Sequence, residues 1–234
     1  MATHRLGIVM HGVTGRMGLN QHLKRSVMPI RESGGVVLSN GDRVVPEPLL
    51  LGRNDAKLMS IAEDLGIDAY TTDYDSALGS SEHALFFDAG TTVMRPELLD
   101  QALSKGKHLY CEKPVACSLA SARKLCARAD AADVKAGVVM DKLFLPGLIK
   151  LGQLKTQGFF GRILSVRIDF GYWVFTGEES PSNRPSWNYR KSSGGGIILD
   201  MMAHWRYVLD HIVAPVHSVV CLGATHVDQR WDER

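Results

Sequence analysis

The chain has 234 residues, of which 45% are hydrophobic and 22% charged, and its 27 Lys and Arg against 25 Asp and Glu leave a formal charge of +2. This balance is typical of a globular protein and excludes disordered, collagen-like and coiled-coil chains. So small a net charge gives no electrostatic basis for nucleic acid or a membrane surface as a partner. No uncharged apolar run approaches the roughly 20 residues that a membrane span needs. The N-terminus has no signal-peptide pattern, and four scattered cysteines without C-x-x-C spacing predict a reduced, cytoplasmic protein.

Short apolar runs alternate with helical patterns through residues 1–142. Strands are expected at 6–10, 49–51, 84–89, 108–111 and 136–140. Helices are expected at 17–27, 55–65, 97–104 and 118–129, with Asp55 as an N-cap and Pro96 and Gly66 as start and stop signals. The alternation predicts parallel βαβ units, and so a Rossmann-type α/β domain. A glycine-rich stretch at about 29–48 contains Asn40-Gly41 and predicts a small inserted hairpin.

The pattern changes in residues 143–234. A helix started by Pro146 is expected at 144–154, followed by a strand at 163–170, a polar loop at 176–196, a helix at 197–212 and a strand at 216–222. These elements predict the start of a second α/β domain with a mixed or antiparallel sheet. Because two strands do not form an independent sheet in water, this substrate domain is expected to be incomplete.

The first strand is followed by Gly12-Val13-Thr14-Gly15-Arg16-Met17-Gly18, which opens a helix. Glycines let the backbone approach a pyrophosphate, and a helix N-terminus supplies amide donors. The G-x-x-G-x-x-G spacing is one residue longer than the usual dinucleotide fingerprint, and the alternative is a purely structural turn. The strand–turn–helix context favours a nucleotide site, with cofactor contacts expected from Gly12, Thr14, Gly15, Arg16 and Met17.

The end of the second strand bears on the choice between NAD and NADP. An acidic residue at this point binds the adenosine ribose, whereas an arginine accommodates the additional phosphate of NADP. Here the tip reads Gly52-Arg53-Asn54, and the first carboxylate, on Asp55, is better placed as a helix cap. We therefore predict that Arg53 and Asn54 bind NADP, with NAD as the other possibility. The alternative is that Arg53 is only a solvated tip residue.

Two further groups of residues suggest catalysis. Cys111-Glu112-Lys113-Pro114 follows the fourth strand, at the edge of a parallel sheet where ligands bind; the alternative is a surface turn.

Asp200 and His204 lie four residues apart on one expected helix, so both can contact one ligand, and a histidine is a natural general base. The alternatives are a core histidine capped by Asp200, or two metal ligands. No third ligand has suggestive spacing, so no metal is predicted.

Taken together, the glycine turn, Glu112-Lys113-Pro114 and the three glycines at 194–196 before Asp200 and His204 resemble the glucose-fructose oxidoreductase / inositol dehydrogenase / MocA family of NAD(P)-dependent oxidoreductases. Residues 102–108 are similar to that family's Ala-Leu-x-x-Gly-Lys-His segment, and the resemblance covers the whole chain. Family members are usually longer and have a larger C-terminal sheet, so this chain resembles a truncated member.

The resemblance implies that Glu112 holds the nicotinamide ribose and that Lys113 lies between nicotinamide and substrate, with Asp200 and His204 completing the catalytic set. It also places Gly90 and Thr91 at the cofactor. In the substrate loop at 185–190, Trp187 and Tyr189 would stack on a sugar and Arg190 would hold an acidic group, unless the loop only packs. The chain departs from the family's pattern at Gly90-Thr91-Thr92, at Arg95, where a histidine is common, and at Met140-Asp141-Lys142, where Asn-Tyr-Arg is usual.

These residues predict an enzyme that transfers a hydride between a nicotinamide cofactor and a sugar-like polyol or ketone. Its expected partners are a small sugar-like substrate and other copies of itself, as a dimer or tetramer through a complete C-terminal sheet. Two alternatives from the same family remain open: an NAD-dependent glycosidase and a non-catalytic nucleotide-binding regulator.

Overall fold

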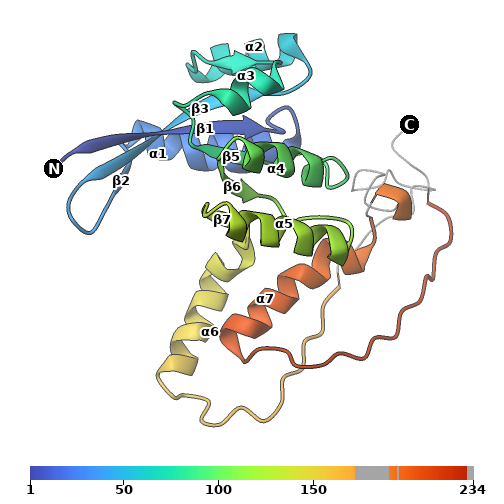
Figure 1. Ribbon diagram of the computed structural model, residues 1–234. Coiled ribbons are helices and arrows are strands. Elements are labelled where there is room, and N and C mark those ends of the chain that lie inside the picture. The colour runs from blue at the N-terminus through green and yellow to red at the C-terminus, as the bar shows by residue number, and fades with distance from the viewer. Residues whose placement is uncertain (172–189, 194, 231–234) are drawn as a thin grey trace. The chain divides into compact units, whose positions relative to one another are not determined.

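The computed structural model describes residues 1–171, 190–193 and 195–230 (Figure 1). The chain divides into two compact units, Met1–Val139 and Met140–Arg234. The boundary expected after residue 142 and this division both follow the last strand of the parallel sheet. No helix in the described residues is long and apolar enough to cross a membrane.

The first unit is built on one seven-stranded sheet. Its strands are β1 (Thr3–His11), β2 (Val36–Val37), β3 (Arg43–Leu51), β4 (Tyr70–Thr71), β5 (Leu85–Asp88), β6 (His108–Cys111) and β7 (Ala136–Val138). Strand β2 pairs antiparallel with the start of β3, and every other pairing is parallel. The order β4-β3-β1-β5-β6-β7 is that of a doubly wound Rossmann sheet, with β1 and β5 at the switch point where ligands bind. The predicted Rossmann-type α/β fold of this unit is confirmed.

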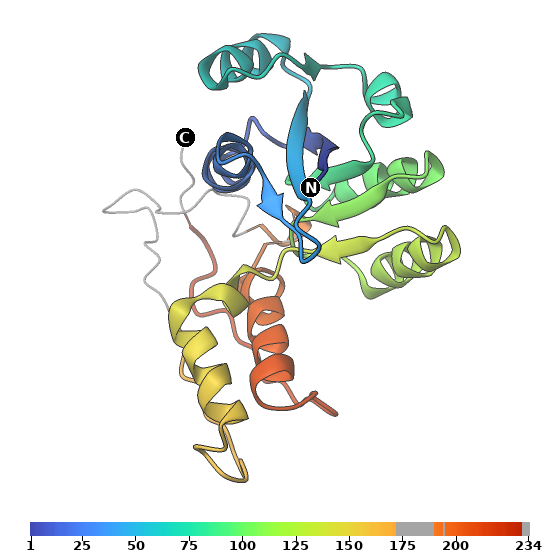
Figure 2. The same ribbon diagram turned by 90° about the vertical axis from the view of Figure 1, so that its left-hand side faces the viewer.

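Helices cover both faces of this sheet (Figure 2). One face packs against η1 (Met17–Val27, a π-helix), α1 (Met28–Glu32) and α2 (Asp55–Leu65), and the other against α3 (Tyr74–Gly79), α4 (Arg95–Ser104) and α5 (Leu119–Ala131). The strands alternate strictly: Ile8 and Met10 lie in one core cluster, whereas Val9 lies in the other. A sheet buried on both faces explains why its strands read as continuous apolar runs.

The structure corrects two local predictions. The N-cap of α2 is Asn54, whose side chain accepts a hydrogen bond from the amide of Lys57, and Asp55 is the first helical residue. Residues 29–48 do contain a hairpin, formed by β2 and the start of β3, but α1 and most of β3 also lie in this range.

The first part of β3 was not predicted from the sequence because it contains Pro46 and Pro48. A proline has no N–H to donate to a neighbouring strand. Leu50 donates its amide to the carbonyl of Ala69, on the side of β3 away from β1, so the nitrogens of Pro46 and Pro48 point to that side too. There β3 has no strand partner in the described sheet between the pairings at Val44 and Leu50. The prolines therefore remove no ladder hydrogen bond.

In the described part of the second unit, all the regular elements are helices. It contains η2 (Asp141–Phe144), α6 (Pro146–Thr156), η4 (Lys191–Ser193), η5 (Ile198–Met202) and α7 (Ala203–Ile212). Helices α6 and α7 lie side by side and share a small core with Tyr207, Val208 and Leu148. The helices predicted at 144–154 and 197–212 are therefore confirmed.

The strands predicted at 163–170 and 216–222 are wrong for this structure: both segments are irregular and form no ladder in the described part of the second unit. A strand needs a partner strand for its N–H and C=O groups. Residues of these segments that would face a core, such as Leu164, Val220 and Leu222, are exposed.

We expect Gly12→Ala to destabilise the first unit much more than Gly66→Ala does. Both glycines have positive φ, 83° and 61°, so each alanine carries a conformational penalty of about 1–2 kcal/mol. At Gly12 the new β-carbon would also lie 2.4 Å from the carbonyl carbon of Ala89, whereas at Gly66 it meets nothing within 4 Å. The clash should add about 2 kcal/mol to the loss of unfolding free energy in urea. Equal losses in the two variants would contradict the close approach of these loops.

Candidate active site

The carboxyl ends of three adjacent strands bring together most of the buried polar residues of the first unit: His11, Asp88, Arg95 and Glu112. Strand β1 ends at His11, β5 at Asp88 and β6 at Cys111, and the pairings place His11 opposite Asp88 and Asp88 opposite Cys111. The glycine turn, Gly90 and Glu112 follow these ends directly. The sequence-predicted residues Gly12, Gly90 and Glu112 therefore lie along one edge of the sheet.

The glycine turn is packed so closely that Gly12 and Gly18 leave no room for a side chain. A β-carbon at Gly18 would lie 2.2 Å from the carbonyl oxygen of Gly12, and one at Gly90 would lie 2.6 Å from Cε1 of His11. The amide of Gly15 donates to the carbonyl of Gly12 at 3.0 Å and closes the turn. Thr14, Gly15 and Arg16 are exposed at the start of η1, and Met17 is half-buried. This backbone cradle fits the pyrophosphate of a dinucleotide, although it is one residue longer than the usual fingerprint.

A hollow of about 340 Å³ adjoins the turn. It is lined by Thr14 and Leu19 on one side and by residues of α2 on the other, namely Ala56, Lys57, Ser60 and Ile61. Arg53, at the end of β3, is exposed. We expected Asn54 to contact the cofactor. Its side-chain oxygen instead accepts a hydrogen bond from the amide of Lys57 at 2.9 Å and so caps helix α2.

Tyr74 adds a polar atom that sequence analysis did not identify. Its ring meets that of His11 edge-on, with centroids 5.6 Å apart. Its hydroxyl oxygen is buried and has no hydrogen-bond partner among the described residues. Burial raises the pKa of this hydroxyl, so it stays protonated and can donate to a ligand. A buried hydroxyl without a partner, close to the ends of the strands, also fits a site built for a polar cofactor.

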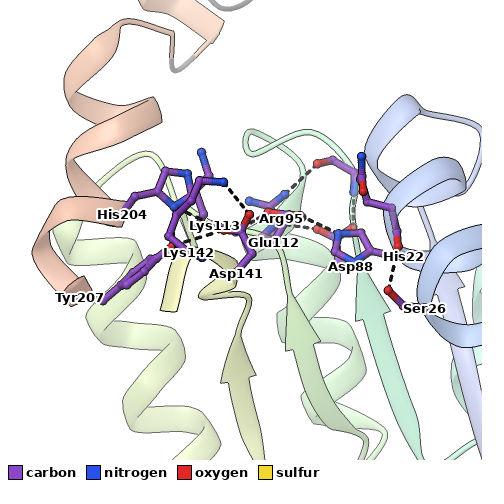
Figure 3. Close-up of polar contacts among 12 residues, drawn as sticks. His22, Ser26, Asp88, Arg95, Glu112, Lys113, Asp141, Lys142, His204 and Tyr207 are labelled. Carbon is purple, nitrogen blue, oxygen red and sulfur yellow. Dashed lines mark hydrogen bonds and ion pairs between the residues drawn. The ribbon is translucent and has the colours of Figure 1, made fainter. Parts of the chain in front are cut away.

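Asp88 and Arg95 form a buried ion pair at the centre of this edge (Figure 3). Nε of Arg95 donates to Oδ2 of Asp88 at 2.6 Å, while Oδ1 accepts from Nδ1 of His11 at 2.6 Å and from the amide of Gly90 at 3.0 Å. Burial acts to raise the pKa of Asp88, but His11 and Arg95 outweigh it and hold that pKa below its usual value. The carboxylate is therefore charged.

The same arginine joins two loops. Nη2 of Arg95 donates to the carbonyl of Gly90 at 2.8 Å, and Nη1 donates to the carbonyl of Pro114. The peptide bond between Lys113 and Pro114 is cis. Sequence analysis identified Arg95 only as a departure from a family pattern and missed Asp88 and His11, because nothing in their spacing indicates that they meet.

Glu112 is nearly buried and is held by two groups of the first unit (Figure 3). Its Oε1 lies 2.6 Å from Nε2 of His22 on η1, and its Oε2 accepts from the amide of Lys113 at 3.2 Å. The ring of His22 packs on Phe87 with centroids 4.7 Å apart. These contacts fix the carboxylate of Glu112 and the backbone of Lys113. Thr91, also expected at the cofactor, is exposed, and its carbonyl accepts from the amides of Met94 and Arg95.

In the second unit, Asp200 lies in η5 and is half-buried, and His204 follows in α7 and is 5% exposed. Nδ1 of His204 is 2.6 Å from the hydroxyl of Tyr207 and 3.6 Å from Oδ1 of Asp141. Arg190 is exposed, just before η4. Trp187, Tyr189 and Gly194 lie outside the described residues. Within the described ranges, no group of three or more His, Cys, Asp and Glu side chains could hold a metal ion.

Two models of known protein families match this chain. The model described as an oxidoreductase family with an NAD-binding Rossmann fold matches residues 42–140, and the GFO/IDH/MocA C-terminal domain matches residues 148–233. The chain belongs to the GFO/IDH/MocA family. The resemblance inferred from its motifs is thus confirmed.

Individual family members extend this comparison. The chain is 50% identical over 226 residues to a D-xylose dehydrogenase of Paenarthrobacter nicotinovorans. The aligned region covers 97% of this chain and 58% of that protein. Its fold matches an NAD binding oxidoreductase from Klebsiella pneumoniae with a TM-score of 0.70 at 25% identity, over 90% of this chain and 54% of the other. A levoglucosan dehydrogenase in complex with NADH and levoglucosan gives a TM-score of 0.72 at 22% identity, over 90% and 55% of the two chains. The chain thus spans somewhat more than half the length of these relatives.

We expect Arg95→Met to lower the free energy of unfolding by about 3–5 kcal/mol, because it leaves the Asp88 carboxylate buried without its cation. Arg128→Met is the matched control. It breaks an ion pair with Asp100 in which both side chains are more than a third exposed, and it should change stability by less than about 1 kcal/mol. Urea unfolding of both variants measures the difference. Similar losses for the two would show that the buried pair does not hold this edge together.

Proposed function

We propose that the protein is an NAD(P)-dependent oxidoreductase that transfers a hydride between the cofactor and a sugar-like polyol or ketone. The observation that carries this proposal is the sheet edge at which the glycine cradle, the buried Glu112 and the backbone-fixed Lys113 follow neighbouring strands. The names of the two sugar dehydrogenases described above support a sugar as substrate. They give no support to a glycosidase or a regulator.

Binding of the cofactor is assigned to the first unit. Gly12, Thr14, Gly15, Arg16 and Met17 would hold the pyrophosphate, and Gly90, Thr91 and Glu112 would hold the nicotinamide half. A bound nicotinamide supplies the hydride acceptor or donor. The protein has to position the substrate, move one proton and stabilise charge on an oxygen atom.

The three catalytic roles fall to Lys113, His204 and Asp200. In the oxidative direction His204 accepts the hydroxyl proton, and the ammonium group of Lys113 stabilises the negative charge that develops on the oxygen. Asp200 holds a neighbouring hydroxyl group of the substrate. Trp187, Tyr189 and Arg190 are proposed to contact the rest of the sugar, by stacking and by charge.

NADP is the proposed cofactor, with NAD as the other candidate. The support is local: Arg53 is exposed at the end of β3, beside the helix that lines the hollow near Thr14. A guanidinium there can pair with a 2′-phosphate. The first carboxylate after it, on Asp55, belongs to the first turn of α2.

We also propose a cytoplasmic location and assembly with other copies of the chain. The four cysteines are free, and Cys117, Cys126 and Cys221 are exposed, as thiols in a reducing compartment can be. Exposed apolar side chains at Leu164 and Val220 support burial by a further protein surface. Light scattering of the purified protein measures the mass of the assembly.

Lys113→Ala should lower turnover with D-xylose, or with another sugar that the protein oxidises, by about 10²-fold or more, because a preorganised charge at the reacting oxygen is lost. The dissociation constant for the cofactor should change little. Lys124→Ala, on the exposed side of α5, is the control and should match the unchanged protein. Near-normal turnover in Lys113→Ala would overturn the assignment, and sugar hydrolysis without net cofactor reduction would favour the glycosidase.

Arg53→Ala should raise the dissociation constant for NADPH by about 10- to 100-fold and leave that for NADH nearly unchanged, because one charge-assisted contact to the 2′-phosphate is removed. Titration of nicotinamide fluorescence measures both constants. Arg123→Ala, another exposed arginine, controls for the loss of charge. If the two constants shift together, or NADH binds more tightly than NADPH before the change, the proposed preference is wrong.

A further inference from the structure

His204 is the first member of a chain of polar groups that leads from a buried position to solvent (Figure 3). Its ring and the ring of Tyr207 are both buried on α7, and Nδ1 of the histidine lies 2.6 Å from the hydroxyl oxygen of the tyrosine. That hydroxyl donates to Oδ1 of Asp141 at 3.3 Å. The side chain of Asp141 is 48% exposed, so the last member of the chain meets water.

The hydrogen bonds of Tyr207 determine which nitrogen of His204 carries the proton. A tyrosine hydroxyl has one proton to donate, and here it goes to Asp141. The same oxygen accepts from the backbone amide of Lys142 at 3.2 Å. With the hydroxyl proton assigned to Asp141, the oxygen accepts from His204, and this assignment puts the proton of the neutral ring on Nδ1 and the lone pair on Nε2. A general base requires that lone pair.

Asp141 is held in its charged form. Burial acts to raise the pKa of this carboxyl, but a hydrogen bond and ion pair with Lys142, whose Nζ is 2.7 Å from Oδ2, together with His204 and Tyr207, lower it below its usual value. Among the residues that the structure describes, the charged and titratable groups in contact with this site include Asp141 and Lys142 from η2 and Tyr207 from α7 itself. Helix α6 contributes the apolar Leu148 to the core beside Tyr207.

We propose that Tyr207 and Asp141 are positioning residues that fix the tautomer of His204 and stabilise its protonated ring. The proposal rests on the proposed role of His204 as general base. When Nε2 takes the substrate proton, the O–H bond of the substrate breaks, an N–H bond forms at Nε2 and the ring becomes a cation. Nδ1–H stays hydrogen-bonded to the Tyr207 oxygen, and the charged carboxylate of Asp141, 3.6 Å from Nδ1, offsets the positive charge. Loss of the Nε2 proton to water then restores the starting tautomer.

Tyr207→Phe tests this role, because it keeps the ring in the core and removes the hydroxyl that holds Nδ1 of His204. We expect kcat to fall by about 10- to 100-fold with little change in KM, which is less than the 10²- to 10⁴-fold that a general base itself contributes. Tyr70→Phe, in β4 of the first unit, is the matched control and should leave kcat unchanged. Urea unfolding confirms that each variant is folded at the temperature of the assay.

Asp141→Asn gives a second readout, which a purely structural role would not change. Loss of the carboxylate removes a charge that favours protonated His204, so the acidic limb of the kcat/KM profile should move to lower pH. His204→Ala separates the two proposals. If it leaves turnover intact, the general base is misassigned. If it abolishes turnover while Tyr207→Phe and Asp141→Asn keep the original kcat and pH profile, only the role proposed for Tyr207 and Asp141 is wrong.

Discussion

The ion pair between Asp88 and Arg95 is the interaction on which the first unit's candidate site depends. Both groups are almost fully buried, so each would be strongly unfavourable there without the other. The pair places a fixed cation between the loop after β5 and the loop after β6, where its remaining N–H groups bind the carbonyls of Gly90 and Pro114. The position of the backbone around Lys113 thus follows from a charge pair formed after the preceding strand, β5. His11 completes it from β1, so three strand ends are fixed by one carboxylate.

A comparable constraint operates in the second unit on a smaller scale. Helix α7 is amphipathic, and the side that packs toward α6 and η2 contains His204 and Tyr207, at positions i and i+3. Packing that buries these rings also brings the tyrosine hydroxyl to Asp141 and to the amide of Lys142. Because Nδ1 of His204 and the hydroxyl of Tyr207 are both hydrogen-bonded, the two rings are buried without leaving these polar atoms unsatisfied. The residues that replace the family's usual Asn-Tyr-Arg are the ones that supply these partners.

Local patterns predicted most elements of the first unit because its sheet is buried on both faces and its helices begin and end at strong signals. Gly66 adopts the left-handed conformation at the end of α2, and Ser118 and Asn54 cap helices through their side chains. The wrong predictions also have physical causes. Strand β3 was predicted too short, since a proline within a strand argues against it unless the edge beside it is unpaired. The strands expected at 163–170 and 216–222 have the right alternation, but alternation supplies no hydrogen-bond partner.

The sequence by itself determined the class of the fold, the place of the glycine cradle and the residues most suited to acid–base chemistry, since each depends on neighbours within a few positions along the chain. Only the tertiary structure decided which polar groups meet. Asp88 with Arg95, His22 with Glu112, and Tyr207 with Asp141 join residues 7, 90 and 66 positions apart. Side-chain contacts of this kind follow from sheet order and helix packing, which no local periodicity encodes.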